Sequence, residues 1–196
     1  MIVERHFKQL LVASGLMLAS SYMVFTAHAA EAPTGFNVTS STFTDGGMMP
    51  ARTAYTKAAN FPNCVGQNVS PQLSWSKPYP GVKSFAVVMF DLEDIQNDTD
   101  LVAYGIPAAV TSFAEGEFSK PSDKFVGGRG SRGDATWRGM CPPPGTAPHH
   151  YAFIVRGTDL DPKELPPGLT SAELDARLRG HLRGTAAIVG VFVRPQ

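Results

Sequence analysis

The chain reads Arg138-Gly-Met-Cys-Pro-Pro-Pro-Gly-Thr-Ala-Pro-His-His-Tyr151 immediately before the apolar run 152–155. Proline fixes the backbone φ at about −65° and glycine permits positive φ, so this stretch predicts a stiff, sharply turned loop. The loop delivers two histidines to the start of a strand, which suits a small polar pocket. It also holds Cys141, one of two cysteines; the other, Cys64, precedes a second motif, Gln67-Asn-Val-Ser-Pro-Gln-Leu-Ser-Trp75.

Short apolar segments separated by turn residues make up the rest of the chain. Its 19 glycines and 16 prolines divide it into short pieces. The run 82–90 is almost continuously apolar, which is typical of a central strand covered on both faces. The other predicted strands are 36–43, 101–106, 151–156 and 186–193. Several strands joined by irregular loops indicate a mainly β sandwich rather than an alternating βαβ fold.

One helix has clear start signals. Thr170-Ser-Ala-Glu173 is a capping box, in which the hydroxyl accepts a backbone N–H and the carboxylate reaches back to the cap. Leucines recur every four residues at positions 174, 178 and 182 and mark one apolar face. Gly184 suits the left-handed residue that ends a helix. We therefore expect one C-terminal helix over about 171–182, packed on the sandwich edge.

The N-terminus predicts a removable secretory signal peptide. A positive start at Arg5 and Lys8 precedes an apolar run of about 16 residues, short for a membrane span of roughly 20. Ala27-His-Ala29 fits the small-x-small cleavage rule, with the cut after Ala29. We expect residues 30–196 to form a single domain that acts in the periplasm or outside the cell. An uncleaved membrane anchor is the alternative.

Charge excludes some function classes. The chain has 17 Lys+Arg and 17 Asp+Glu, and loss of the leader's Glu4, Arg5 and Lys8 leaves a formal net charge of −1. Nucleic-acid binders carry a strong basic field, so no nucleic-acid partner is expected. The mature chain has no long basic amphipathic helix, so no stable membrane insertion is expected after cleavage.

The two cysteines both survive cleavage. An even pair in an oxidising compartment favours one disulfide, Cys64–Cys141, closing a loop of about 77 residues. The chain-entropy model gives such a link roughly 4 kcal/mol. Two buried thiols are the alternative. A metal site is a less favoured interpretation of the cysteines than either of these, because the chain lacks CxxC and HxxxH spacing. We expect no metal or cofactor.

The two opening motifs resemble those of the phosphatidylethanolamine-binding protein family, also called Raf-kinase-inhibitor-like. The run 66–75 is similar to its N-x-S-P-x-L-x-W segment, and 139–151 to its G-x-x-P-P-x-G … H-R-Y segment. The run 83–91 resembles the strand that ends in its D-P-D-A-P motif. A cysteine near each motif is similar to the secreted bacterial branch. The resemblance covers nearly all of the mature chain and implies an antiparallel β-sandwich with a few peripheral helices.

The resemblance also implies a small surface pocket for phosphate, phosphorylated head groups or acetate. A histidine can donate to an anion, carboxylates can orient that histidine, and turn amides with an aromatic wall supply dipoles and shape. Carried over position by position, the ligand-binding residues are Asp91, Glu93, Trp137, Gly139, Pro142, Pro143, His149 and Tyr151. His150 is expected to face the other side of the strand.

The departures from the family pattern concern charge. The D-P-D-A-P motif reads Asp91-Leu-Glu-Asp-Ile95, and the position of a second pocket histidine holds Asp100, which we add to the site. Carboxylates around a lone His149 predict a more negative pocket than the family usually has. We therefore expect weak binding of phospho-ligands, and either a preference for an amine or cation or no small ligand at all, unless Arg129, Arg132 or Arg138 folds over the pocket and favours phosphate.

Three functions from different classes follow. The first is an exported, non-catalytic protein that binds a small polar or anionic ligand such as a phosphorylated head group. The second is a protein partner role, inhibition of a protease or kinase through the pocket rim, because relatives are known to act in this way. The third is a hydrolase using Ser70, His149 and Asp91, although the sequence lacks a G-x-S-x-G elbow. A thiol nucleophile at Cys141 would be blocked by the disulfide.

Two further motifs have simpler explanations. Gly127-Gly-Arg-Gly-Ser-Arg-Gly133 lacks the Lys-Ser/Thr ending of a phosphate-binding P-loop, which favours a flexible turn. The acidic run 91–100 does not match a calcium-binding EF-hand loop, which favours a solvated loop.

Overall fold

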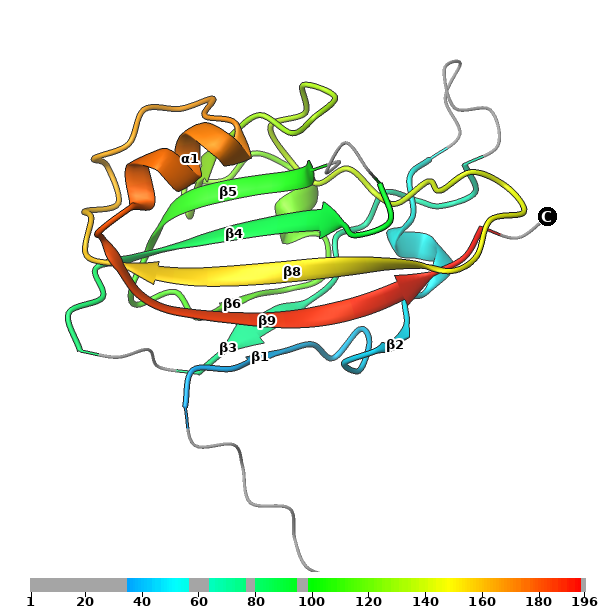
Figure 1. Ribbon diagram of the computed structural model, residues 1–196, viewed down its shortest axis with the longest axis horizontal. Helices are drawn as coiled ribbons and strands as arrows, with labels where there is room; N and C mark the ends of the chain where they lie inside the picture. Colours follow the sequence, from blue (N-terminus) through cyan, green and yellow to red (C-terminus); the bar gives the residue numbers. More distant parts are fainter. Residues whose placement is uncertain (1–34, 57–63, 77–79, 95–98, 195–196) are drawn as a thin grey trace, which may run out of the picture. The chain divides into compact units, whose positions relative to one another are not determined.

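A computed structural model describes residues 35–56, 64–76, 80–94 and 99–194. The predicted signal peptide and its cleavage site lie outside the described residues. All described elements belong to one compact unit, Pro33–Gln196. Figure 1 shows strands in two layers, with helix α1 against one end of the larger sheet.

The sandwich predicted from the sequence is confirmed. A six-stranded sheet has the order β2-β9-β8-β4-β5-β7, and a three-stranded sheet the order β1-β3-β6. The strands are β1 (Val38–Thr39), β2 (Gly47–Met48), β3 (Leu73–Trp75), β4 (Ser84–Asp91), β5 (Thr99–Pro107), β6 (Ser112–Phe113), β7 (Val126–Gly127), β8 (His149–Thr158) and β9 (Leu182–Phe192). Single turns of 3-10 helix cover Ala51–Thr53 and Glu117–Ser119. The pairing is antiparallel except between β2 and β9, which run parallel.

The long strands are found where the sequence predicted them, but the first is much shorter than 36–43. Its ladder ends at Thr39 because side chains bond the backbone that follows. Ser40 Oγ donates to the carbonyl of Gln72 at 2.5 Å, and the N–H of Ser41 donates to Gln72 Oε1 at 2.6 Å. A single glutamine thus replaces strand pairing in this segment.

Helix α1 (Ser171–Leu178) starts as predicted and ends earlier. The capping box of Thr170 and Glu173 is present. The expected extension to residue 182 is wrong, because Gly180 rather than Gly184 takes the left-handed conformation, with φ +83°. Leu182 therefore begins β9 and is 44% exposed instead of packing on the helix face.

Strand β4 is buried on both faces, as its apolar run predicts. Phe85, Val87 and Met89 face the core between the two sheets. The alternate residues, including Val88, pack with Leu174 and Leu178 under α1. This central strand fixes the position of Asp91 at its end, where the candidate site begins.

Candidate ligand-binding site

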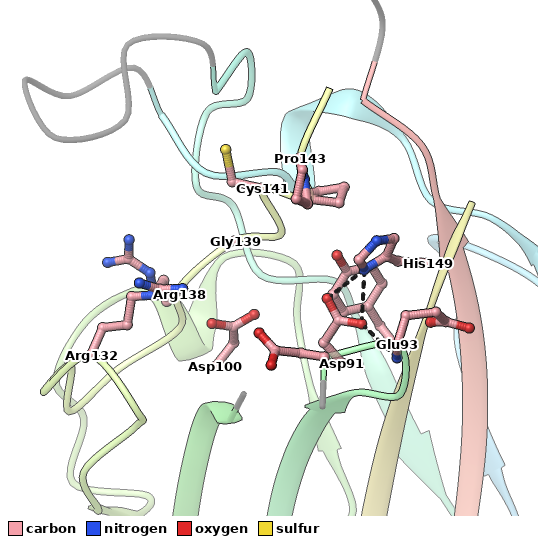
Figure 2. A pocket seen from close by; sticks show the side chains of 12 residues that line it. Asp91, Glu93, Asp100, Arg132, Arg138, Gly139, Cys141, Pro143 and His149 are labelled. Atoms are coloured by element: carbon pink, nitrogen blue, oxygen red, sulfur yellow. Dashed lines mark hydrogen bonds and ion pairs between the residues drawn. The ribbon is translucent and has the colours of Figure 1, made fainter. Parts of the chain in front are cut away.

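A cavity of about 410 Å³ lies where β4 ends and β8 begins. Figure 2 shows Asp91 and His149 on one side of it and Arg132 and Arg138 on the other. The antiparallel register pairs Asp91 with Tyr151, which brings the end of the run 83–91 beside the motif 139–151. The lining residues are Asp91, Glu93, Asp94, Asp100, Arg132, Arg138, Gly139, Cys141, Pro142, Pro143, His149 and Tyr151.

His149 is oriented by the carboxylate of Asp91. Its Nδ1 lies 2.8 and 3.0 Å from the two carboxylate oxygens, and the two side chains are only 12% and 10% exposed. The backbone N–H of Glu93 also donates to Asp91, at 3.0 Å. On the other edge of the imidazole, Thr146 Oγ1 lies 3.4 Å from Nε2. Both ring nitrogens of His149 therefore have neighbours within the protein.

Glu93 is held at the rim by His150. The Nδ1 of His150 lies 2.7 Å from Glu93 Oε1, and its backbone N–H donates to Oε2 at 2.5 Å. Burial raises the pKa of Glu93, but the hydrogen bonds from His150 outweigh it and leave the pKa below its ordinary value. His150 is exposed, and sequence reasoning assigned it no contact with the site. The adjacent histidines thus each bind one carboxylate of the same short segment.

Tyr151 offers a hydrogen bond that the described part of the chain does not use. The residue is 1% exposed and lines the cavity, and no described acceptor meets its hydroxyl at hydrogen-bond geometry, although the Asp91 carboxylate is close enough to act on it. Burial, followed by the charge of Asp91, raises the pKa of the phenol far above its ordinary value. The hydroxyl therefore stays protonated at all physiological pH values and acts as a donor.

Two arginines supply the positive side of the cavity. Arg138 is 8% exposed, donates to Asp134 at 3.1 Å, and lies 4.1 Å from the centre of the Tyr55 ring, a cation–π contact. Arg132 also lines the cavity. Arg129 lies instead in a second cavity near the start of α1. Of the three arginines named from the sequence, Arg132 and Arg138 therefore line the cavity and Arg129 does not.

The loop carrying Arg138 is fixed by Asn68. Asn68 has φ +57°, in the left-handed region, and its side chain bonds both neighbours of the arginine. Its Nδ2 donates to the carbonyl of Trp137 at 3.2 Å, and its Oδ1 accepts from Gly139 N at 2.7 Å. A Cβ at position 139 would lie 2.4 Å from the backbone oxygen of Thr53, so glycine is required for this close approach.

The predicted disulfide is present. Cys64 and Cys141 are bonded, with Cα atoms 5.6 Å apart. Cys141 lines the cavity, so the bond ties the loop before the second motif to the cavity wall. Arg194 Nη1 donates to the sulfur of Cys141 at 3.3 Å.

Two residues proposed from the sequence lie outside the cavity lining. Trp137 is buried, its Nε1 donates to the carbonyl of Thr53 at 3.2 Å, and it stacks on Phe153. It supports the loop from behind. Ser70, the hydrolase candidate, is fully buried and accepts from the backbone N–H of Phe118 at 3.1 Å. The other predicted ligand-binding residues line the cavity; Asp94 and Cys141 join them without having been predicted as ligand contacts.

Asp91, Glu93 and His149 are the one described group with metal-ligand spacing, their donor atoms lying within 4.8 Å of one another. Oxygen and imidazole ligands suit several divalent cations. Here, however, Asp91 binds the Nδ1 of His149, and Glu93 binds His150. The arrangement is therefore better described as two His–carboxylate pairs than as a prepared cation site.

The fold and sequence define the class of protein. The sequence model of the phosphatidylethanolamine-binding protein family matches residues 39–193. The chain therefore belongs to the phosphatidylethanolamine-binding protein family.

Relatives with related sequences come from several organisms. UPF0098 protein YbcL of Escherichia coli K12 is 29% identical over 182 residues, 90% of this chain and 97% of YbcL. The crystal structure of YbcL, described as a new member of the mammalian PEBP family, matches with a TM-score of 0.71 and 30% identity, over 81% of this chain and 98% of YbcL. A Mycobacterium tuberculosis H37Rv protein named putative lipoprotein LppC is 29% identical, over 83% of this chain and 75% of its own length.

The described residues contain one α-helix, which has eight residues. It is too short to cross a membrane.

Proposed function

We propose that this is an exported, non-catalytic binding protein whose cavity takes a small ligand carrying both a phosphorylated group and an amine, of which phosphoethanolamine is the simplest. The buried hydroxyl of Tyr151 is the observation that carries the proposal. A buried donor without a partner costs about 1–3 kcal/mol. A ligand oxygen that accepts from this hydroxyl removes that cost.

The charges around the cavity favour a ligand with both signs. Four carboxylates and two guanidiniums line it, with His149 beside them. A simple anion gains from the arginines but is repelled by the carboxylates. An ammonium group on the same ligand is attracted by the carboxylates and so offsets their repulsion of the phosphate. The carboxylates and the arginines lie on opposite sides of the cavity in Figure 2, which gives the ligand a preferred orientation.

Several observations support export. The N-terminal sequence predicts a signal peptide. The disulfide is the kind of bond that persists in an oxidising compartment. One relative is named as a lipoprotein.

Titration calorimetry on the mature protein tests the proposal. We expect phosphoethanolamine to bind at least tenfold more tightly than either inorganic phosphate or ethanolamine. Arg132→Gln should weaken phosphoethanolamine binding and leave ethanolamine binding unchanged. Equal affinity for phosphate and phosphoethanolamine, or binding of none of the three, would contradict the proposal.

A second candidate function, ester hydrolysis, is favoured by one contact. Thr146, His149 and Asp91 are arranged as hydroxyl, imidazole and carboxylate, with 3.4 Å between Thr146 Oγ1 and His149 Nε2. The hydroxyl of Thr146 donates to the carbonyl of Pro143 at 2.9 Å, so its proton is not directed at the imidazole. Turnover of a generic ester that is lost in Thr146→Val would establish this function, and activity unchanged in that variant would exclude it.

A further inference from the structure

The second cavity, near the start of α1, differs in charge from the first. Its volume of about 490 Å³ lies in the range of small-molecule sites, roughly 300–1,000 Å³. Among the described residues, two arginines, four hydroxyl side chains and two glycines line it, and none of these is acidic. Four carboxylates line the first cavity. The second cavity therefore favours an anion more clearly than the first does.

The glycine-rich turn 127–133 carries both arginines of the second cavity. The N–H of Arg129 donates to the carbonyl of Leu169, and the N–H of Ser131 donates to the carbonyl of Thr99, each at 2.9 Å. In return, Ser131 Oγ accepts from the N–H of Thr99 at 2.8 Å. The turn is thus fastened to the start of β5 and to the residue before the helix cap, which fixes the backbone that carries the arginines.

Side chains rather than backbone amides offer the donors of this cavity. The N–H of Gly130 donates to the carbonyl of Asp134, and the N–H of Gly133 donates to the carbonyl of Gly130, each at 2.9 Å. The turn is therefore not a phosphate-binding loop of open amides. The hydroxyl hydrogen of Ser131 has no acceptor among the described residues, so it can donate to a ligand.

The guanidinium of Arg129 forms no hydrogen bond or ion pair with a described residue. Glu173 interacts with it electrostatically but does not line the cavity. The carboxylate of Glu173 is bound to the helix start instead, where its Oε2 accepts from the N–H and from the hydroxyl of Thr170, each at 2.9 Å. Thr170 and Ser171 complete the cavity wall, so the positive end of the helix dipole adds to the charge of Arg129.

Arg132 lines both cavities, and Figure 2 shows it beside Arg138, across the first cavity from His149. A guanidinium presents its N–H donors in a planar fork that matches the oxygens of a phosphate or sulfate group. We propose that the second cavity binds a small phosphorylated or sulfated molecule through Arg129 and Arg132, and that this occupant competes for Arg132 with the ligand of the first cavity. The competition rests on the proposed function, whereas the second site stands on its own lining.

The coupling between the two cavities is negative for two reasons. Two anions on either side of one guanidinium repel each other, and each of them lowers the share of the Arg132 charge that the other receives. Because coupling of binding free energies is reciprocal, the first ligand weakens the second by the same factor.

An NMR titration with inorganic sulfate tests the second site. Potassium sulfate is compared with potassium chloride at matched ionic strength, and the backbone amides of residues 129–133 and of Ser171 are followed. We expect shifts that saturate with sulfate, and binding about fivefold weaker in Arg129→Gln. Arg179→Gln removes the same charge from an exposed residue outside both cavities and should bind sulfate like the wild type. Shifts that do not saturate, or unchanged sulfate affinity in Arg129→Gln, would overturn the site.

Calorimetry with phosphoethanolamine in the two salts tests the competition. We expect sulfate to weaken phosphoethanolamine binding in the wild type and in Arg179→Gln, and to weaken it several-fold less in Arg129→Gln. Equal weakening in all three proteins would place the competing sulfate in the first cavity and overturn the competition. If phosphoethanolamine does not bind at all, the proposed function fails and the competition fails with it, whereas sulfate shifts that depend on Arg129 still support the second site.

Discussion

Tyr151 and Asn68 show how single side chains shape the cavity in opposite ways. Tyr151 brings a hydroxyl donor that the described residues do not satisfy, whereas Asn68 satisfies the backbone on both sides of Arg138. The first creates a requirement for a ligand atom. Asn68 holds the backbone of Arg138 in the position from which its guanidinium can bind the same ligand.

Replacing Tyr151 with phenylalanine should separate binding from stability. The change removes only the buried hydroxyl, so we expect phosphoethanolamine affinity to fall by roughly 10- to 100-fold while the free energy of unfolding stays equal or rises slightly. Calorimetry and thermal unfolding measure the two quantities. Unaltered affinity in Tyr151→Phe would mean that the hydroxyl does not contact the ligand.

Asn68 should tolerate neither loss of its amide nor an ordinary side chain. Asn68→Ala loses two hydrogen bonds and puts alanine, which tolerates the left-handed region less well than asparagine, at φ +57°; together these lower the free energy of unfolding by about 2–4 kcal/mol. Asn68→Gly loses the same bonds without the backbone strain, so it should be about 1 kcal/mol more stable than Asn68→Ala. Urea unfolding gives both values, and identical stability of the two variants would argue against the strain.

At the level of elements, the end of β4 is fastened to the start of β8 by two His–carboxylate pairs, Asp91 with His149 and Glu93 with His150. The pairs lie next to one another in sequence, on adjacent residues of β8. They therefore connect the edge of the cavity to the strand that carries Tyr151.

The pH dependence of stability should show the contribution of Glu93. Its folded pKa lies below the ordinary value of 4.5, so the stabilisation is fully present above about pH 4.5 and is lost as the pH falls through the lower folded pKa. Thermal unfolding of wild type and Glu93→Gln should therefore differ at about pH 7 and converge toward about pH 3. Asp123→Asn, an exposed residue that does not line the cavity, is the control. A gap that widens on acidification would contradict this sign.

The elements also show what could be predicted from the sequence. The start of α1 was predictable, because Thr170 and Glu173 form a local capping box. Its end was not, because the choice between Gly180 and Gly184 depends on the pairing of Leu182 with Thr158 across β9 and β8. Local signals determine where an element begins, while tertiary pairing can decide where it stops.

The same distinction applies to the site. The resemblance to the phosphatidylethanolamine-binding protein family implied that Asp91, His149 and Tyr151 share one pocket, and all three line the cavity. The sequence could not show that Trp137 turns into the core while Arg138 turns toward the cavity. These orientations depend on hydrogen bonds from Asn68 to the backbone on both sides of Arg138, and the two residues are 70 positions apart in the chain. His150 was assigned to the opposite face and its link to Glu93 was missed, because a side-chain pair across the strand end leaves no periodic signal.

At the scale of the whole molecule, the disulfide joins two segments 77 residues apart. The chain-entropy model predicts that its loss lowers the free energy of unfolding by about 4 kcal/mol. Urea unfolding of the wild type with and without a dithiol reductant measures this, and a Cys64→Ala/Cys141→Ala variant should match the reduced protein. Thiol titration confirms that the reduction is complete. If the urea midpoint of the fully reduced protein equals that of the oxidised protein, the disulfide does not contribute this stability.

The cavity lies at one end of the sandwich, where β4 ends and β8 begins, and ligand binding there can be examined directly. A crystal structure of the mature protein soaked with phosphoethanolamine is the most direct measurement. We predict the phosphate within hydrogen-bond distance of the Tyr151 hydroxyl and of an arginine, with the ammonium group toward the carboxylates of Asp91 and Glu93. A fully occupied ligand elsewhere on the surface, or a cavity holding only water at saturating concentration, would contradict the account.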